Sequence, residues 1–289
     1  MKNSIDDIYI TGKLLKSARI KDEWYRDITD PELILEEIRK KSVYADIFTF
    51  RQRLPDSIPH YKYHTIYDSI AALRIHNYTE WWNNQINSKT RNAVRRSEKM
   101  GVEIKKASFN DEFISGMVNI FNETKIRQGK SFWHYGKDFD TVKSEFSRNL
   151  HREEIFGAYY ERDLIGFLFL AFTDRYAMIT QILSFIRHRN KSVNNALMAT
   201  AVKVCSEKHF PYLVYAKWPR GSLADFKRHN GFKKVNLPVF YIPLTLIGKI
   251  ALKLNLQNGI RKLIPDSVKN IVIIIRKKLK SLISSKKWK

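Results

Sequence analysis

Apolar and polar positions alternate along the chain with two periods, and these periods predict its secondary structure. Apolar side chains recur every three or four residues over 109–128 and 193–205, which predicts two amphipathic helices. Between them lie segments rich in apolar and β-branched residues, separated by turns at Arg162-Asp163 and Asp174-Arg175. Such segments predict a meander of sequential strands. The three predicted strands cover residues 155–161, 164–172 and 176–186.

The first hundred residues also predict alternating helices and strands. Asp30 followed by proline is typical of a helix start, and apolar segments at 8–15, 45–50 and 71–75 predict strands. A basic helix is expected over 89–100, which Gly101 should end. This part of the chain therefore predicts an α/β half of its own.

The last third completes the pattern. We expect a strand over 211–218, a short helix capped by Ser222 that stops at Asn230-Gly231, and a closing strand over 232–244. The sequence thus predicts an α/β (α+β) fold with a mixed, mainly antiparallel sheet flanked by helices. The expected domains are a diverged N-terminal α/β half over 1–105, a main domain over 106–249 and a basic amphipathic tail over 250–289.

Charge narrows the classes of partner. The chain has 52 Lys and Arg against 29 Asp and Glu, a formal net charge of +23, which favours RNA, phosphorylated sugar carriers or an anionic lipid surface. One cysteine excludes an intramolecular disulfide, and no apolar run follows a cationic start, so we expect a cytoplasmic protein. No zinc-type Cys/His spacing, Gly-x-Ser-x-Gly elbow or Walker loop is present, so no metal is expected.

The order of elements over 153–243 resembles the GNAT superfamily of acyltransferases, and some members carry a second, diverged copy of the fold. The GNAT loop Gln/Arg-x-x-Gly-x-Gly/Ala, which holds the pyrophosphate of acyl-CoA, corresponds here to 189–194, where both glycines are absent. The resemblance implies a sheet splayed near 185 and 215, with Ser192 capping a helix that points into the gap. The residues expected to hold the phosphates of the donor are Arg187, Arg189, Lys191, Ser192, Val193 and Asn194.

Two further segments resemble the FemAB-like branch of this superfamily. They are Phe226-Lys227, where many GNAT members have a tyrosine that protonates the leaving thiolate, and the basic segment 89–104 after Trp81-Trp82. The chain is shorter than typical members and lacks a coiled-coil arm. The resemblance implies transfer of an acyl or aminoacyl group to an amine of a cell-envelope or polysaccharide precursor. No permanently bound cofactor is expected, and the donor is either acyl-CoA or aminoacyl-tRNA.

Other candidate residues come from their chemistry and position. Residues 126–139 combine cations for phosphate, rings for stacking and one imidazole, and His134 is the candidate catalytic base. The alternatives are a solvated basic helix face at 89–104, and, for 126–139, rings of Trp133 and Tyr135 packed under the sheet with His134 as a surface histidine. We expect Arg91, Arg127, Trp133 and His134 to converge between the two halves. The candidate substrate-binding residues are Lys89, Arg91, Arg95, Arg127, Lys130, Trp133, Tyr135, Lys217 and Lys227.

The tail predicts contact with a membrane surface. Residues 250–289 contain eleven Lys or Arg and one acid, Asp266, beside many apolar residues, and this pattern favours an amphipathic anchor at an anionic membrane's inner face. The alternative is a helix docked on the body. For the whole chain, two other functions stay open: an acetyl-CoA-dependent N-acetyltransferase, and a non-catalytic RNA- or membrane-binding protein on a degenerate GNAT scaffold.

Overall fold

The computed structural model describes residues 8–41, 43–219 and 221–257. Within them, ten strands form one sheet in the order β1-β2-β3-β12-β4-β11-β10-β9-β8-β5, and β6 and β7 form a separate hairpin. The strands are β1 (Ile8–Thr11), β2 (Ser17–Ile20), β3 (Ile47–Arg51), β4 (His64–Arg74), β5 (Glu103–Ala107), β6 (Ile126–Arg127), β7 (Lys130–Ser131), β8 (Glu153–Tyr160), β9 (Asp163–Phe172), β10 (Ala177–Ser184), β11 (Tyr212–Lys217) and β12 (Lys233–Pro243).

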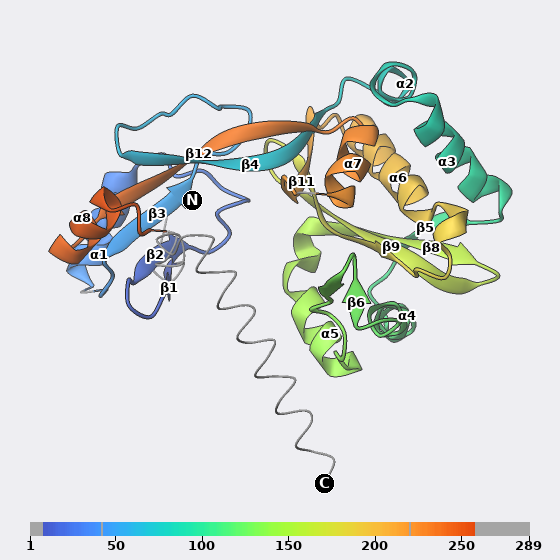
Figure 1. Ribbon diagram of the computed structural model, residues 1–289, viewed down its shortest axis with the longest axis horizontal. Coiled ribbons are helices and arrows are strands. Elements are labelled where there is room, and N and C mark those ends of the chain that lie inside the picture. Colours follow the sequence, from blue (N-terminus) through green and yellow to red (C-terminus); the bar gives the residue numbers. More distant parts are fainter. Residues whose placement is uncertain (1–7, 42, 220, 258–289) are drawn as a thin grey trace, which may run out of the picture.

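Helices cover both faces of the second half of this sheet. In Figure 1, α3, α6 and α7 lie above β8 and β9, and α4 and α5 lie below them. The helices are α1 (Pro31–Lys40), α2 (Tyr78–Glu80), the π-helix η2 (Trp81–Gln85), α3 (Ser88–Lys99), α4 (Asp111–Phe121), α5 (Phe139–Phe146), η3 (Ser147–Arg152), η4 (Arg189–Lys191), α6 (Val193–Glu207), α7 (Ser222–His229) and α8 (Leu246–Lys253). The largest hydrophobic core lies around these layers.

The order β5-α4-α5-β8-β9-β10-α6-β11-α7-β12 confirms the predicted GNAT-type fold. The sheet is mixed and mainly antiparallel, because only β2 with β3 and β10 with β11 pair in parallel. The meander β8-β9-β10 and the helix after it form where the apolar periods predicted them. Successive side chains of β9 point to opposite faces of the sheet, and the helices on each face bury the side chains that point towards them.

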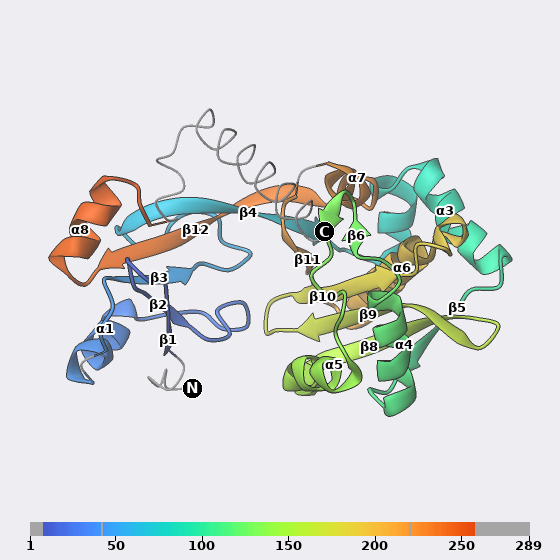
Figure 2. The ribbon, with the colours of Figure 1, turned by 60° about the horizontal axis from the view of Figure 1, so that its bottom comes forward.

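The two halves of the chain share this sheet. Strand β12 pairs with β4 from Lys233↔Ala72 to Tyr241↔His64 and also pairs with β3, so it lies between two strands of the first hundred residues. Figure 2 shows β4 and β12 side by side, running from the end that holds α8 to the middle of the molecule near β11. The division into 1–105 and 106–249 stays a prediction, and any such domains are joined by continuous hydrogen bonding.

Several local predictions hold and two are wrong. Asp30 caps α1, accepting from the amide of Glu32 at 3.0 Å, and Gly101 ends α3 with a φ of 76°. The helix expected over 109–128 ends at Phe121, because the chain turns there into the β6–β7 hairpin. Ser222 is the first residue of α7 and Gly221 holds the cap position, so Ser222 is not the cap.

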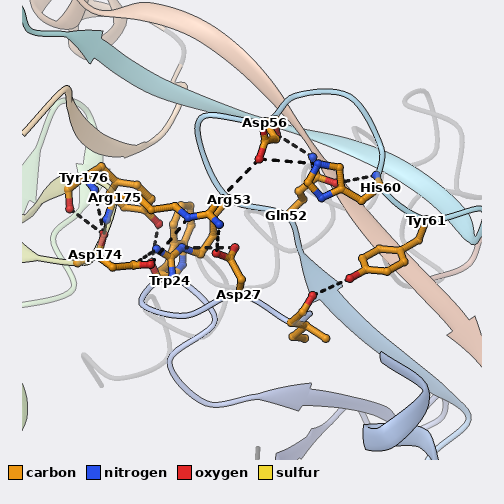
Figure 3. Close-up of polar contacts among 12 residues, drawn as sticks. Trp24, Asp27, Gln52, Arg53, Asp56, His60, Tyr61, Asp174, Arg175 and Tyr176 are labelled. Atoms are coloured by element: carbon orange, nitrogen blue, oxygen red, sulfur yellow. Dashed lines mark hydrogen bonds and ion pairs between the residues drawn. The ribbon is translucent and has the colours of Figure 1, made fainter. Parts of the chain in front are cut away.

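A network of charges around the buried Arg53 joins the two halves (Figure 3). The guanidinium of Arg53 is fully buried and pairs with Asp174 from the β9–β10 turn. Arg175 from the same turn pairs with Asp27 at 2.9 Å, and the Tyr176 hydroxyl donates to the Trp24 carbonyl at 2.5 Å. These contacts fix the loop before α1 against the beginning of β10.

The first residues of the predicted tail belong to the folded body. Ala251 and Leu252 on α8 are buried against Ile47, Val239 and Tyr241. The opposite side of α8 carries exposed apolar side chains, namely Leu246, Ile247, Ile250 and Leu254. None of the helices in the described ranges is long and apolar enough to cross a bilayer. The predicted tail beyond residue 257 lies outside the described residues.

Candidate active site

The sheet opens between β10 and β11. These parallel strands pair only at Ala177↔Leu213 and Met178↔Val214, although β10 continues to Ser184 and β11 to Lys217. This confirms the predicted splay. The backbone N–H and C=O groups that border the opening have no partner across it, so they can bind an extended ligand as a strand would.

Irregular backbone marks both borders of the opening. The register of β10 with β9 shifts between Ile179 and Gln181, so Thr180 is an extra residue in a bulge. The register of β11 with β4 shifts between Val214 and Lys217, and Ala216 has a φ of 46°. Bulges re-aim side chains and end strand pairing, and they are common beside active sites.

The loop at the far end of β10 keeps its shape without glycine. Ser192 has a φ of 55°, the left-handed conformation that glycine adopts most easily, and it occupies the first glycine position of the GNAT motif. Ser192 holds the N-cap position of α6, as predicted, but its side chain forms no cap hydrogen bond, because in this conformation the hydroxyl does not meet the amides of the first turn. The first-turn amides of α6, which starts at Val193, are left without side-chain caps. Asn194 occupies the second glycine position, and its Oδ1 is buried without a partner.

The cations of this loop have different environments. Lys191 is largely buried, with its ammonium 3.6 Å from the centre of the Tyr160 ring, while the Arg187 guanidinium stacks on Phe185 at 3.5 Å. Arg189 is exposed. Burial, followed by the charges of Arg187 and Lys191, lowers the pKa of His188 below its usual value. Arg187 and Arg189 are thus the solvent-exposed cations of this loop.

Arg127 anchors the loop from the other face of the sheet. Its guanidinium donates to the Ser184 carbonyl at 3.1 Å and pairs with Glu123 at 3.1 Å. The Glu123 carboxylate accepts from the backbone N–H groups of Ile186 at 2.6 Å and Arg187 at 2.9 Å. Arg127 was expected to bind substrate. Instead, its guanidinium bonds to Ser184 and Glu123 and so fixes the chain where β10 ends.

Lys227 lies beside the opening. Its side chain is 1% exposed, and its ammonium donates to the carbonyl oxygens of Tyr215 at 2.5 Å and Lys217 at 3.0 Å. Burial lowers the pKa of Lys227 to about 8, so it is mainly protonated at neutral pH. The side chain of Lys217 is exposed and pairs with Asp68 at 3.0 Å. An ammonium has three donors, so Lys227 keeps one N–H beyond these two bonds.

The segment 126–139 splits between surface and core. Trp133 is 67% exposed under the ammonium of Lys137, and Tyr135 and Lys130 are also exposed. His134 is 2% exposed and stacks on Phe121 at 4.1 Å. Burial, followed by the charge of Lys137, lowers the pKa of His134 to about 4. The imidazole is therefore neutral and enclosed, which gives its predicted role as a base no geometric support.

The basic helix α3 lies on the other side of the sheet. It packs beside α6, whereas α4 and the β6–β7 hairpin lie below β9 (Figure 1). Arg91 donates to the carbonyls of Trp82 at 3.0 Å and Ile86 at 2.6 Å, so it closes the π-helical turn. Arg95 lies over the Trp82 ring at 5.5 Å, and Lys89 is exposed. The expected convergence of Arg91 with Arg127, Trp133 and His134 is wrong, because the sheet separates them.

Sequence analysis missed a carboxylate at the bulge. The Glu153 side chain at the start of β8 accepts a hydrogen bond from the Thr180 hydroxyl at 2.7 Å. A lone acid at a strand end belongs to no motif. The only available signal was the pair Glu153-Glu154, since neighbouring residues of a strand face opposite sides of the sheet.

Two cavities lie near these residues, one beside the loop after β10 and one beside the charge network around Arg53. One, of about 470 Å³, lies between α4 and the β8–β9 turn, and Arg162 and Arg187 line it. The other, of about 240 Å³, is lined by His60 and Tyr61 from the loop after β3 and by Arg175 from the β9–β10 turn. In Figure 3, Asp56 lies between Arg175 and His60, 3.6 Å from the Arg175 guanidinium and 3.7 Å from the His60 ring nitrogen.

Comparison with solved structures supports the fold. No family model matches the chain, and no curated protein matches it. L-PGS from Bacillus licheniformis shares 13% identity over 85% of this chain and 83% of that one, with a TM-score of 0.57. The C-terminal domain of a candidate lysylphosphatidylglycerol synthetase from Agrobacterium fabrum shares 12% over 88% and 86%, with a TM-score of 0.56. FemX shares 10% over 80% and 83%, with a TM-score of 0.55. At these identities the likeness shows a common fold alone.

Proposed function

We propose that this protein is an acyltransferase that moves an acyl or aminoacyl group from an anionic donor to an amine of a cell-envelope or polysaccharide precursor. One observation carries the proposal: β10 and β11 separate after Met178 and Val214, next to the buried ammonium of Lys227. The unpaired edge of β10 can hold an extended acyl chain by backbone hydrogen bonds. Lys227 can stabilise the negative charge that develops on the reacting carbonyl or the leaving atom.

The donor is proposed to bind where α6 begins. The start of α6, where no side chain caps the first-turn amides, and the exposed Arg189 suit a phosphate group. Asn194 places a side chain where GNAT members have glycine or alanine, which supports anion binding without tight binding of CoA. The name of one solved neighbour, a synthetase of lysylphosphatidylglycerol, favours an aminoacyl donor. Acyl-CoA and aminoacyl-tRNA both remain donors to be tested.

The acceptor is proposed to meet the exposed segment after β6. Lys130 and the rings of Trp133 and Tyr135 face solvent there, and such a combination suits a phosphorylated sugar. Arg127 ties this segment to the end of β10. The acceptor surface is thereby held beside the opening between the strands.

The decisive experiment measures transfer and binding with both donors. We expect labelled acyl groups to pass from charged tRNA or acetyl-CoA to an amine-bearing sugar precursor. Arg189→Ala should weaken donor binding in calorimetry about tenfold, because one charge-assisted phosphate contact is lost. Lys203→Ala, on the same helix farther from its start, is the matched control. A folded protein that binds neither donor would instead support the non-catalytic scaffold.

A membrane-surface role is proposed for the chain's end. The exposed apolar side of α8 and the basic sequence after it support binding to anionic lipid. The full chain should pellet with phosphatidylglycerol vesicles, and added salt should weaken this binding through screening. Deleting 258–289 should abolish most of the binding without lowering the melting temperature. Deletion from residue 250 is a poorer test, because it removes Ala251 and Leu252 from the core.

Two results would contradict this proposal. One is equal pelleting of the full and shortened chains. The other is equal binding to neutral phosphatidylcholine vesicles. Ile250→Glu offers a second variant, since this residue is exposed and its replacement leaves the docked side of α8 intact.

A further inference from the structure

Glu153 is a partly buried carboxylate without a cation beside it. Within the described part of the chain, no Lys, Arg or His forms an ion pair with it, although the protein carries a net charge of +23. Its neighbour Glu154 points the other way and pairs with Lys106 at 3.1 Å and Lys208 at 3.0 Å. Burying a carboxylate without a cation beside it costs stability, so its presence at this position calls for a functional explanation.

The carboxylate is hydrogen-bonded to the strand that borders the opening. Its hydrogen-bond donor, Thr180, is the bulged residue of β10, two positions beyond Met178, the last residue of β10 that pairs with β11. Glu153 and Met178 both pair with Ala171 on the intervening strand β9. The small alanine side chain leaves room for Glu153 and Thr180 to meet over it.

The groups around Glu153 keep its carboxylate available. Arg152 lies over the Tyr25 ring at 4.8 Å and forms its ion pair with Asp22 at 3.0 Å. Burial, then the charge of Glu153, raises the pKa of Tyr25 to about 12, so this phenol stays neutral. Tyr176 is also buried, and its hydroxyl donates to the carbonyl of Trp24, the residue before Tyr25. Burial also raises the pKa of Glu153, opposed by the hydrogen bond from Thr180.

We propose that Glu153 is the general base that accepts the proton of the acceptor amine. This inference rests on the proposed function. As the amine nitrogen bonds to the acyl carbon, the bond from that carbon to the sulfur of a thioester or the oxygen of an ester breaks. The amine proton passes to Glu153, and the leaving thiolate or alkoxide takes a proton from Lys227 or water. Thr180 orients the carboxylate through its hydroxyl.

The test compares Glu153→Gln with Glu154→Gln. Glutamine keeps the shape of the side chain but cannot accept the proton, so kcat/KM should fall about 100-fold or more. The acidic limb of the pH profile should disappear, because activity no longer requires ionisation of this carboxyl. Donor affinity in calorimetry should not change. Glu154→Gln alters the adjacent acid on the opposite face and should keep both the rate and the profile.

Each outcome separates this inference from the proposed function. If Glu153→Gln keeps the rate and the pH profile of the wild type, the proposed role of Glu153 is overturned and the transferase proposal stands. Absence of transfer by the wild-type protein with either donor overturns both. Glu153→Asp covers the case of a glutamine variant that does not fold: it keeps the acid but shortens its reach, so the rate should fall while the acidic limb remains.

Discussion

Replacing Lys227 with methionine should lower the rate of acyl transfer about 100-fold. The effect follows from losing a preorganised cation beside the reacting carbonyl, where removal of a single donor typically costs that much. Because the pKa of Lys227 is about 8, wild-type activity should also fall as pH rises through about 8 and the ammonium becomes neutral. The measurement is single-turnover transfer as a function of pH.

The thermal stability of Lys227→Met distinguishes a catalytic role of this lysine from a structural one. The pKa of Lys227 is lower in the folded protein than the ordinary value, so the unfolded chain binds this proton more tightly. Stability therefore rises as pH increases from about 8 towards the ordinary value, and the protonated lysine opposes folding below that range. Methionine removes this opposition, so Lys227→Met should melt no earlier than the wild type. Lys233→Met, on an exposed neighbour, is the control, and wild-type transfer by Lys227→Met would refute the role.

The elements could be predicted from the sequence, but their long-range arrangement could not. The strands over 155–186 and the helix after them follow from local apolar periods. The position of β12 between β3 and β4 depends on pairing between residues more than 150 positions apart, such as Lys233 with Ala72. Such pairing leaves no local signal, and the prediction of two halves therefore missed their shared sheet.

The candidate site shows the same limit at the level of single residues. Lys227 and the loop 189–194 could be found because they occupy motif positions. His134 and Arg127 were chosen for their chemistry. In the structure His134 stacks on Phe121 in the core, and Arg127 bonds to the carbonyl of Ser184 at the end of β10. Glu153 was missed because the importance of a lone acid depends on which side chains surround it.

Replacing Arg53 with alanine should destabilise the protein by about 3 kcal/mol. The fully buried guanidinium fills space between Asp27, Asp174 and Tyr176, so truncation leaves a cavity and removes the ion pairs of a buried cation. Asp174 is largely exposed, and this limits the cost of leaving it unpaired. For a chain of this size, the loss corresponds to a fall in melting temperature of roughly 6–12 °C.

Methionine at this position separates packing from charge. Arg53→Met keeps much of the volume and requires no desolvated cation, so it should recover at least half of the stability lost in the alanine variant. Lys143→Met removes an exposed pair with Asp111 and should change stability by less than about 1 kcal/mol. Equal melting temperatures for wild type and Arg53→Ala would refute the structural role of this junction. Because the junction also fixes the loop that places Tyr25 near Glu153, Arg53→Ala should lower transfer activity even at temperatures where it remains folded.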